Sequence, residues 1–376
     1  MKIAIYNLTT TTKAGGVESF TLGIACALAK RGHTVHIHGG RAVGGENIVE
    51  TVHGQMECVT VFTYPYLNRR YVPNFGTRFR KFVERLSLSI FALVPLIRGK
   101  YDIIYIHKPY DLPVALLVAA ISGAKAVFNS HGTEFFPGYR WMVKRLYKFF
   151  SCSTYNAIDV RLNTSIRPIV LYNGIDTERF RPLSRSKELI KRHSINGEHI
   201  LISICRLVGW KGLQYAISAL PHIDKSLSIK YFIGGEGPYE NTLRQLAADL
   251  GVADKVVFLG RLPNAEIPAY YSIADVALYP SVADETFGIS IAEAMSCGMP
   301  VVAGNVGGIL EVVGDSGLLI PPKDELAIAK AVNTLLVNDE LRQRLGISAC
   351  DRVLHNFNWD MIAERFEQEI GVIGGA

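Results

Sequence analysis

The sequence lacks the cysteine patterns that mark disulfide frameworks and structural metal sites. Its 376 residues contain six cysteines, which are scattered, with no CxxC pair and no histidine beside them at metal-ligand spacing. This absence argues against structural zinc and favours a reducing compartment.

Long apolar runs are also missing. A membrane-spanning helix needs about 20 apolar residues, whereas the nearest candidate, from Leu86 to Ile97, has 12 and contains Pro95. The first two residues are followed at once by a strand-like segment, so we expect no signal peptide. The sequence predicts a protein that does not span a membrane.

The dinucleotide fingerprint GxGxxG does not follow the first predicted strand, where the chain offers only Gly15-Gly16. This weakens the case for a nicotinamide enzyme. No nucleic-acid recognition motif accompanies the basic residues, so we expect no nucleic-acid partner.

The composition is globular, 49% hydrophobic and 20% charged, in a chain long enough for two domains. Strand-like and helix-like segments alternate and then begin a second alternation near residue 199, which predicts an α/β protein with two doubly wound parallel sheets. The predicted strands are 2–6, 34–38, 58–63, 102–106, 125–129, 199–204, 228–233, 255–259, 275–279 and 299–303. The predicted helices are 17–31, 77–98, 112–122, 139–150, 212–220, 238–250 (with Pro238 at its first position), 266–273, 289–297, 325–337, 339–350 and 359–370.

The most informative stretch runs from Asp284 to Val313. Glu285 would lie in a loop, and Glu293 would follow about two turns along the next helix. Gly288 allows close backbone approach at that helix N-terminus, which binds anions and hydrogen-bond acceptors. Carboxylates accept the O–H protons of a polyhydroxyl ligand. Spacing alone leaves open that both acids are ordinary loop and helix residues.

This stretch resembles the E-x7-E region of the retaining glycosyltransferases of the GT-B fold, family 4 in particular. The resemblance implies two Rossmann-like domains facing each other across a cleft. Residues 1–172 would bind the acceptor and residues 173–357 the nucleotide sugar, with the last helix, 358–376, crossing back onto the first domain. Glu285 would hold hydroxyls of the transferred sugar and Glu293 the ribose, with Phe287, Gly288 and Ile289 between them at the donor.

Two cations, Arg206 and Lys211, follow a predicted strand. The segment resembles the family's G-R-L-x-x-x-K-G diphosphate clamp, with Cys205 in place of the first glycine. Cations at a strand's carboxyl end suit a diphosphate leaving group, whose charge grows as the glycosidic bond breaks. The alternative is two exposed basic residues on a loop.

Several other candidate site residues are suggested mainly by the resemblance to the family. Gly234 and the pair Arg261 and Leu262 would border the nucleotide, although Leu262 is equally a candidate core residue. The pair at 307–308 offers a further phosphate-facing helix start. Gly15 and Gly16 match the family's glycine loop beside the donor diphosphate and the acceptor, with a plain turn as the alternative.

His131 follows a predicted strand, at the sheet edge where open α/β proteins bind ligands. The family places a histidine here against the donor sugar, which implies a catalytic-site role in hydrogen bonding to the sugar or the reaction centre. A histidine satisfied by nearby backbone is the alternative.

The Asp-x-Asp metal motif of the other common glycosyltransferase fold is missing, so we expect no required metal or cofactor beside a UDP- or GDP-sugar donor. No pair of carboxylates nominates a nucleophile for double displacement. The resemblance implies same-face attack on the donor, with the leaving diphosphate taking the acceptor's proton.

Charge is unevenly divided along the chain. Residues 1–172 carry 21 Lys+Arg against 9 Asp+Glu, whereas the rest has a net charge of −6. The helices predicted at 77–98 and 139–150 combine aromatic residues with the basic rows Arg78, Lys81, Arg85 and Arg140, Lys144, Lys148. Such helices suit an anionic membrane surface, although they are also ordinary sheet-covering helices. We expect a cytoplasmic protein on the inner face of the cell membrane, acting on a glycan or lipid-linked acceptor such as a lipopolysaccharide precursor.

Residues 151–172 look too short for the strand, serine-bearing turn, helix and strand that the family runs before its V-P-N-G-[IV]-D hinge, which here reads Leu171-Tyr-Asn-Gly-Ile-Asp176. Either the element is abbreviated or residues are missing from the sequence. Three functional alternatives stay open on the same fold: a sugar phosphorylase, a sugar-nucleotide epimerase and a non-catalytic sugar-nucleotide-binding protein.

Overall fold

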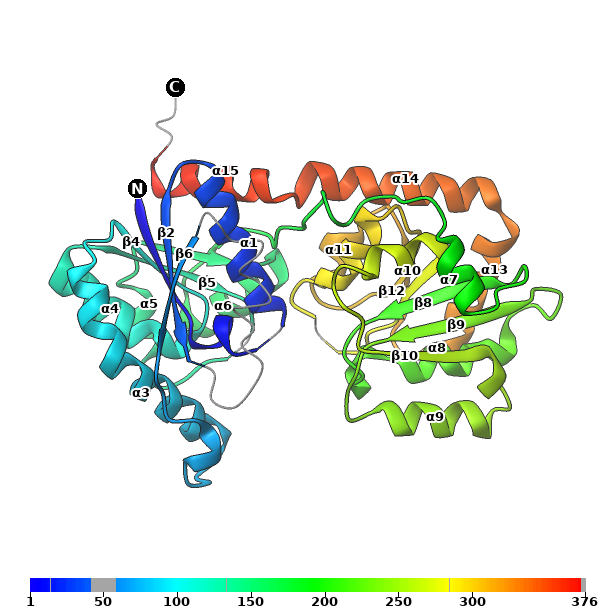
Figure 1. The fold of residues 1–376 in the computed structure, drawn as a ribbon, viewed down its shortest axis with the longest axis horizontal. Helices are drawn as coiled ribbons and strands as arrows, with labels where there is room; N and C mark the ends of the chain where they lie inside the picture. Colours follow the sequence, from blue (N-terminus) through cyan, green and yellow to red (C-terminus); the bar gives the residue numbers. More distant parts are fainter. Residues whose placement is uncertain (14, 42–58, 133, 284, 373–376) are drawn as a thin grey trace. The chain divides into compact units, whose positions relative to one another are not determined.

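The computed structural model describes residues 1–13, 15–41, 59–132, 134–283 and 285–372. It divides into two compact units, Met1–Gly174 with Trp359–Ala376, and Ile175–Asn358 (Figure 1). Each unit contains one parallel sheet with helices packed on both faces. The predicted fold class, α/β with two doubly wound sheets, is confirmed.

The sheet of the first unit has the strand order β3-β2-β1-β4-β5-β6-β7. The strands are β1 (Lys2–Tyr6), β2 (Thr34–Gly40), β3 (Val59–Tyr64), β4 (Ile103–Ile106), β5 (Lys125–Ser130), β6 (Lys148–Ser151) and β7 (Ile169–Val170). The α-helices are α1 (Gly16–Lys30), α3 (Thr77–Arg98), α4 (Leu112–Ser122), α5 (Tyr139–Val143), α6 (Thr154–Thr164) and α15 (Trp359–Ile370). Short 3-10 turns are η1 (Leu8–Thr11), η2 (Arg69–Tyr71) and η3 (Pro109–Asp111).

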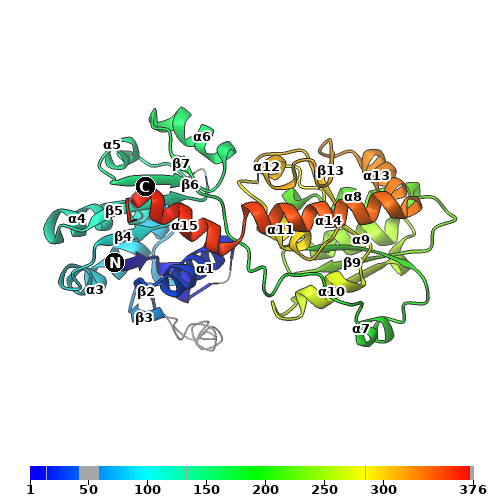
Figure 2. The same cartoon turned by 90° about the horizontal axis from the view of Figure 1, so that it is seen from above.

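Side chains of β1 alternate between the two faces of this sheet, as they must along a strand. Ile3 and Ile5 pack with helices α1 and α15, whereas Ala4 and Tyr6 pack with α3 and α4. Figure 2 shows the two helix pairs on opposite sides of the strands. Both faces are therefore buried, which explains the continuous apolar character of the strands.

The last helix completes the core of the first unit. Ile362 and Phe366 are buried among residues of β1 and α1. The indole of Trp359 lies so close to two glycines that a Cβ added at Gly23 or Gly174 would come within 2.0 or 2.3 Å of it. The described residues 359–372 thus belong structurally with the first unit, although they follow the second in sequence.

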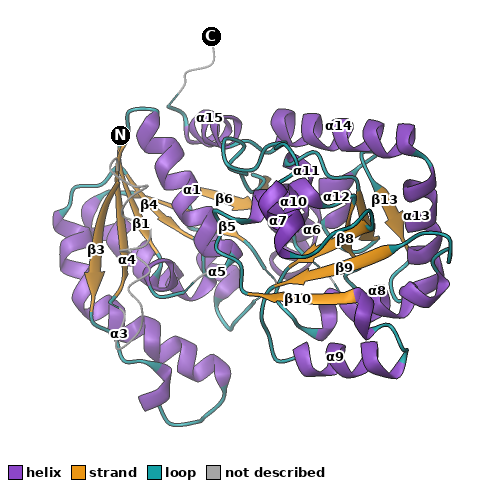
Figure 3. Ribbon diagram, turned by 45° about the vertical axis from the view of Figure 1, so that its right-hand side comes forward, coloured by secondary structure: helices purple, strands orange, loops and turns teal. Residues whose placement is uncertain are grey.

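The sheet of the second unit has the order β10-β9-β8-β11-β12-β13. Figure 3 shows its strands β8, β9 and β10 side by side. Its strands are β8 (His199–Ile204), β9 (Ile229–Gly234), β10 (Val256–Gly260), β11 (Val276–Tyr279), β12 (Val301–Gly304) and β13 (Leu318–Ile320). The helices are α7 (Lys187–Arg192), α8 (Leu213–Ala219), α9 (Glu240–Asp249), α10 (Ile267–Ile273), α11 (Ile289–Ser296), α12 (Ile309–Val313), α13 (Glu325–Val337) and α14 (Asp339–Asn356). Its 3-10 turns are η4 (Gly209–Lys211), η5 (Leu220–His222) and η6 (Ala253–Lys255).

Both sheets contain a topological switch point, where the chain reverses the direction in which it adds strands. It lies between β1 and β4 in the first unit and between β8 and β11 in the second. Open α/β sheets bind ligands outside the carboxyl ends of the strands at such points. The loops after these four strands are therefore the places to look for function.

The predicted helix over 139–150 is wrong. Tyr139–Val143 form α5, and Lys148–Ser151 form strand β6, paired in parallel with β5. The apolar residues that looked helical serve two cores, because Phe149 packs on one face of the sheet and Phe150 on the other. A basic row spaced along one helix through residue 148 therefore does not exist.

The same error made residues 151–172 look short. Strand β6 is followed by Ser153, whose Oγ accepts from Asn156 N at 3.0 Å and caps helix α6, and then by strand β7. Strand, serine-bearing turn, helix and strand are all present. Helix α9 begins at Glu240, so Pro238 is not its first residue. Cys58, the first residue of the predicted strand 58–63, lies outside the described residues.

Candidate functional site

Two loops meet at the switch point of the second sheet. The loop after β8 carries Arg206 and Lys211, and the loop after β11 carries Glu285. The loops are joined by a hydrogen bond from Val282 N to Trp210 O, 2.9 Å long. The fold therefore brings together the predicted diphosphate clamp and the predicted sugar-binding acid.

Lys211 and Glu285 form an ion pair within this site. The Lys211 Nζ donates to both carboxylate oxygens of Glu285 at 2.8 and 2.7 Å, and the two side chains are 9% and 15% exposed. Ser281 Oγ lies 3.4 Å from the same carboxylate, and Lys211 Nζ lies 4.6 Å from the centre of the Trp210 ring. Arg206 is exposed, its Cζ lies 5.8 Å from the centre of the Trp210 ring, and it forms no ion pair with a carboxylate of the described residues.

Two residues of this site were not predicted from the sequence: Trp210, which lies within the clamp segment, and Ser281, which precedes the stretch from Asp284 to Val313. Gly307 and Gly308, predicted as a phosphate-facing helix start, have a further role that the sequence did not indicate. A Cβ on Gly307, whose φ is +56°, would lie 2.4 Å from Glu285 O, and Gly308 N donates to that oxygen at 2.6 Å. The two glycines thus support the backbone that carries Glu285, and α12, which follows them, has only five residues.

Glu293 lies on α11 and is half-buried. Removal of its carboxyl from water raises its pKa to about 8; the negative charge of Asp176 adds to the shift, and the positive charge of Arg179 opposes it. A neutral carboxyl can donate one hydrogen bond and accept others, which suits a ligand that carries neighbouring hydroxyls.

Three residues between the two acids were predicted at the donor, and they differ in what they can offer a ligand. Gly288, with φ of +99°, precedes the first residue of α11, Ile289, which is half-buried. The ring of Phe287 is buried against Phe357, with centroids 5.3 Å apart. The Phe287 side chain is therefore part of the core, and only its backbone is available to a ligand.

The predicted nucleotide-bordering residues lie together on the other side of β8. A Cβ on Gly234 would lie 3.0 Å from Leu262 Cδ1, so these two residues touch. Arg261 is exposed and Leu262 half-buried. Gly235 approaches the clamp loop so closely that a Cβ there would lie 1.9 Å from Cys205 O.

In the first unit, the predicted glycines begin helix α1 after strand β1. Gly16 is the first helical residue, and Gly15 precedes it in an extended conformation. A Cβ on Gly15 would lie 2.6 Å from Glu18 Oε2, so the carboxylate of α1's first turn covers this glycine. A side chain at residue 15 would displace Glu18.

His131 follows β5 and packs on Phe20, with ring centroids 4.6 Å apart, and on His107, 5.5 Å away. Burial lowers the pKa of His131 to about 3, with the charge of Lys108 acting in the same direction and a hydrogen bond with Asn173 opposing it. The imidazole is therefore neutral at physiological pH and able to hydrogen bond without carrying charge.

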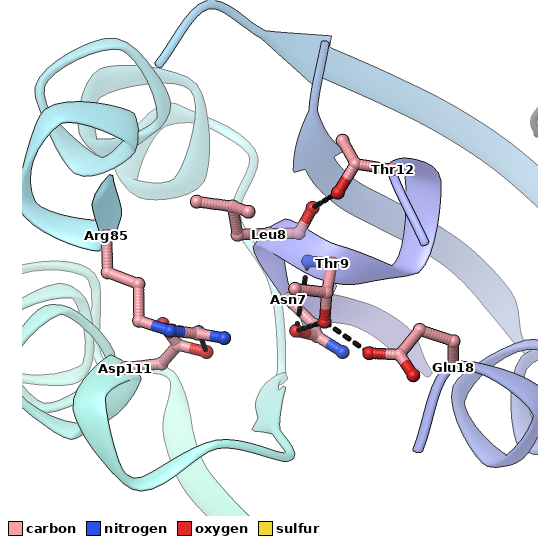
Figure 4. Close-up of polar contacts among 7 residues, drawn as sticks. All are labelled: Asn7, Leu8, Thr9, Thr12, Glu18, Arg85 and Asp111. Atoms are coloured by element: carbon pink, nitrogen blue, oxygen red, sulfur yellow. Dashed lines mark hydrogen bonds and ion pairs between the residues drawn. The ribbon is translucent and has the colours of Figure 1, made fainter. Parts of the chain in front are cut away.

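A cluster of polar side chains beside α1 was missed by sequence analysis (Figure 4). Thr9 Oγ1 lies 2.5 Å from Glu18 Oε1 and 3.1 Å from Asn7 Oδ1. Next to it, Arg85 of α3 binds the fully buried carboxylate of Asp111. Asn7 follows β1 and Asp111 follows β4; an inventory of polar residues after each predicted strand would have found both.

These contacts also correct the basic row predicted on helix 77–98. Arg85 is buried in its pair with Asp111 and does not face solvent. Lys81 pairs with Glu134 on the same side, and the side chain of Arg78 lies outside the described part of the structure. In the described part of the chain, no group of three or more His, Cys, Asp or Glu side chains is placed to hold a metal ion.

Comparison with known proteins assigns this pair of sheets and loops to a class of enzyme, the glycosyltransferases. Residues 185–352 match the family model described as Glycosyl transferases group 1, and residues 14–179 match Glycosyltransferase Family 4. The chain belongs to glycosyltransferase family 4.

Curated relatives agree. The GDP-mannose-dependent alpha-(1-6)-phosphatidylinositol monomannoside mannosyltransferase of Mycobacterium tuberculosis is 33% identical over 71% of this chain and 75% of its own length. The D-inositol 3-phosphate glycosyltransferase of Corynebacterium diphtheriae is 26% identical over 95% of this chain and 90% of its own. The prediction of a glycosyltransferase that uses a nucleotide sugar is confirmed at this level.

Solved structures share the fold. Anabaena Alr3699/HepE in complex with UDP superposes with a TM-score of 0.80 at 21% identity, covering 99% of this chain and all of that one. Sucrose-phosphate synthase from Thermosynechococcus elongatus gives 0.81 at 20% identity, covering 98% and 97% of the two chains. The predicted GT-B fold is confirmed.

Proposed function

We propose that the protein transfers a sugar from a nucleotide-diphosphate sugar to a membrane-associated acceptor, with retention of configuration at the anomeric carbon. The observation that carries the proposal is the juxtaposition of Lys211 and Glu285 at the switch point of the second sheet. One group suits a diphosphate, the other a sugar hydroxyl, and both are held in a nearly dry setting where their charges act strongly.

In this scheme the second unit binds the donor. Arg206 and Lys211 bind the diphosphate and stabilise the charge that develops on it as the bond to the sugar breaks. Glu285 accepts the O–H proton of a sugar hydroxyl, and neutral Glu293 exchanges hydrogen bonds with the ribose. Gly234, Arg261 and Leu262 border the rest of the nucleotide.

The reaction breaks the bond between the anomeric carbon and the leaving phosphate oxygen and forms a bond to the acceptor oxygen on the same face. The acceptor's proton passes to the departing diphosphate. No side chain is required as a nucleophile, which fits the engagement of Glu285 with Lys211. His131, which is neutral because it is buried, contributes a hydrogen bond to the sugar or the reaction centre. The loop at Gly15 and Gly16 is proposed to border the donor diphosphate and the acceptor.

The relatives' names support the choice of donor and acceptor. Anabaena Alr3699/HepE binds UDP, and the mycobacterial relative uses GDP-mannose and acts on a phosphatidylinositol mannoside. We therefore propose a UDP- or GDP-sugar as donor, bound by residues 173–357, and a glycan or lipid-linked acceptor, bound by residues 1–172.

Membrane contact is supported by the outer face of α3. Six apolar side chains on this helix are 42–68% exposed. They are Phe79, Phe82, Leu86, Ile90, Phe91 and Val94. The side of α3 that packs on the protein carries the Arg85–Asp111 pair, so the apolar face points outward. In the described residues, no helix is both long and apolar enough to cross a membrane.

The charge around this face favours an anionic lipid surface. Residues 65–100 contain eight Lys and Arg and one acid, Glu84, which is buried. Exposed apolar residues beside basic ones bind at the headgroup boundary of anionic leaflets, and the cytoplasmic leaflet is anionic. We place the enzyme peripherally on the inner face of the cell membrane.

The function is tested by incubating the protein with a panel of UDP-, GDP- and ADP-sugars. Thermal shift identifies the donor, because a ligand that binds only the folded state raises its melting temperature. Release of nucleoside diphosphate that depends on an acceptor and leaves an α-configured product from an α-configured donor supports retaining transfer. Dependence of turnover on inorganic phosphate would instead indicate a phosphorylase, interconversion of the donor sugar an epimerase, and binding without turnover a non-catalytic protein.

A further inference from the structure

Trp210 lies close to both cations that the proposed reaction uses at the diphosphate. It is the middle residue of η4, in the loop after β8, and it is half-buried. The centre of its ring is 4.6 Å from Lys211 Nζ and 5.8 Å from Arg206 Cζ. The face of an aromatic ring attracts a cation at distances up to about 6 Å. One ring therefore attracts both charges of the predicted clamp.

The two cations differ in what else holds them. Lys211 donates to both carboxylate oxygens of Glu285, and its side chain is 9% exposed. Arg206 is exposed, and its guanidinium forms neither a hydrogen bond nor an ion pair with the residues that the structure describes. Within the described ranges, the Trp210 ring is thus the group that restrains the Arg206 guanidinium.

Two hydrogen bonds hold the backbone at Trp210. Trp210 O accepts from Val282 N of the loop after β11 at 2.9 Å. The carbonyl of the preceding residue, Gly209, accepts from Gln214 Nε2 of α8, also at 2.9 Å. The backbone that carries the ring is therefore tied to a neighbouring loop and to a helix, whereas the long Arg206 side chain projects into solvent. The ring is the fixed partner of this contact and the guanidinium the movable one.

A restraint on Arg206 matters for binding of a diphosphate. An arginine side chain has several rotatable bonds and loses conformational freedom when it is immobilised on a ligand. A guanidinium binds phosphate best when two of its N–H groups point at two phosphate oxygens. A contact that already limits the orientations of the guanidinium reduces the entropy lost on binding and so strengthens it.

We propose that Trp210 is a positioning residue of the diphosphate site, whose ring holds the Arg206 guanidinium in place for the phosphates of the donor. Trp210 acts through Arg206 and does not itself bind the base or the sugar. The inference rests on the proposed function, in which Arg206 and Lys211 bind the leaving diphosphate.

The restraint can be measured without a ligand. The NMR order parameter of the Arg206 Nε–H group is expected to fall in Trp210→Leu. Trp210→Phe should restore most of it, because a phenyl ring keeps a weaker attraction for cations. Trp141→Leu is the matched control, since Trp141 stacks on Arg145 in the first unit, with Arg145 Cζ 3.2 Å from the ring centre, and should leave Arg206 unchanged. An equally low order parameter in the unsubstituted protein and in Trp210→Leu overturns the inference.

The consequence for binding is measured by isothermal titration with inorganic pyrophosphate, which has two phosphates but no base and no sugar. Trp210→Leu is expected to weaken pyrophosphate binding about two- to fivefold, the value of an exposed cation–π contact, and Trp210→Phe to weaken it less. The nucleoside diphosphate of the identified donor should lose the same factor. Loss for the nucleotide without loss for pyrophosphate would mean that the ring contacts the base or the ribose, which contradicts a role through Arg206.

A double variant separates positioning from support of the loop. Arg206→Gln removes the charge that the ring restrains, so Trp210→Leu added to it should weaken pyrophosphate binding no further. If Trp210 only supports the loop, its replacement should cause the same loss with and without Arg206, and that result also overturns the inference.

Turnover of a nucleotide sugar by the unsubstituted protein tests the proposed function separately. A protein that transfers the sugar but shows no effect of Trp210→Leu on Arg206 or on pyrophosphate contradicts this inference alone. A protein that shows both effects of Trp210→Leu but turns over no nucleotide sugar contradicts the proposed function alone.

Discussion

Lys211 Nζ lies within hydrogen-bonding distance of both carboxylate oxygens of Glu285, at 2.8 and 2.7 Å, although the two residues are 74 positions apart in the sequence. The pair is nearly buried, so each charge depends on the other for its solvation. Any substitution of one partner therefore acts on the other, and the two residues should be studied together.

Glu285→Gln and Lys211→Met are expected to separate the two roles. Both should abolish most transfer. Glu285→Gln leaves Lys211 free for the diphosphate, so nucleoside diphosphate affinity should be retained or increase, whereas Lys211→Met should reduce it about tenfold or more. Isothermal titration with the diphosphate of the identified donor measures the difference. Equal loss of affinity in both variants would contradict the assignment.

The same pair predicts a stability pattern. Lys211→Met leaves the Glu285 carboxylate buried without its partner, which should lower the free energy of unfolding by about 3 kcal/mol. The double variant Lys211→Met/Glu285→Gln removes the stranded charge and should recover much of the loss. Urea denaturation of the three variants gives the coupling free energy, and strict additivity would show that the pair does not hold the site together.

Gly307→Ala tests the support of the Glu285 backbone. The added Cβ would lie 2.4 Å from Glu285 O, so the loop must move, with loss of most transfer and of about 1–3 kcal/mol of stability. Gly251→Ala is the matched control, because Gly251 also has positive φ, +65°, but nothing lies within 4 Å of its added Cβ. Similar activity in both variants would rule out the positioning role.

Glu293 predicts a pH dependence of stability. Its pKa is about 8 in the folded protein and 4.5 when unfolded, so between these values the folded state retains a proton that the unfolded state has released. Stability should therefore fall as the pH rises from about 4.5 to 8, by about 1 kcal/mol per pH unit from this group. Glu293→Gln carries no such proton and should be more stable than the unsubstituted protein at pH 8. Chemical denaturation across this range measures both curves, and parallel curves would show that Glu293 is charged in the folded state.

The outer face of α3 predicts lipid binding. Phe82→Ser and Leu86→Ser should each weaken binding to vesicles containing phosphatidylglycerol about tenfold, because each removes a large apolar contact. Binding should also weaken as salt is raised. Leu162→Ser on α6 is the control, since Leu162 is 79% exposed but lies on a different helix of the same unit. Cosedimentation gives the partition coefficients; an equal effect of all three substitutions would remove the assignment to α3.

Local patterning identifies strand β8, so the sequence could place Arg206 and Lys211 in the loop that follows it. Their role as a diphosphate clamp comes from the family resemblance and stays a prediction. The contact between Lys211 and Glu285 could not be predicted. It exists because β8 and β11 are neighbours, and strand order depends on packing across the whole sheet. The role of Gly307 was hidden for the same reason, since its partner is the backbone of Glu285.

Errors in the first unit have a different origin. The segment 139–150 has basic and aromatic residues at helical spacing, yet its last three residues belong to strand β6, which pairs with β5. The periodicity of a short segment carries no information about a strand partner elsewhere in the chain. Arg85 was expected on a solvent-facing row, and its partner Asp111 lies 26 residues away on the far side of β4, so only the folded structure shows that the cation is buried.

Helix α15 makes the order of synthesis matter. The contiguous residues 175–358 leave the ribosome as a complete unit, whereas the unit that emerges first lacks Trp359, Ile362 and Phe366 until α15 has been translated. Until then the face of its sheet that carries Ile3 and Ile5 has only the part of its cover that α1 provides. Nascent chains should therefore depend on chaperones until α15 has emerged, and a chain that stops within α15 should be degraded even though every proposed donor ligand is present.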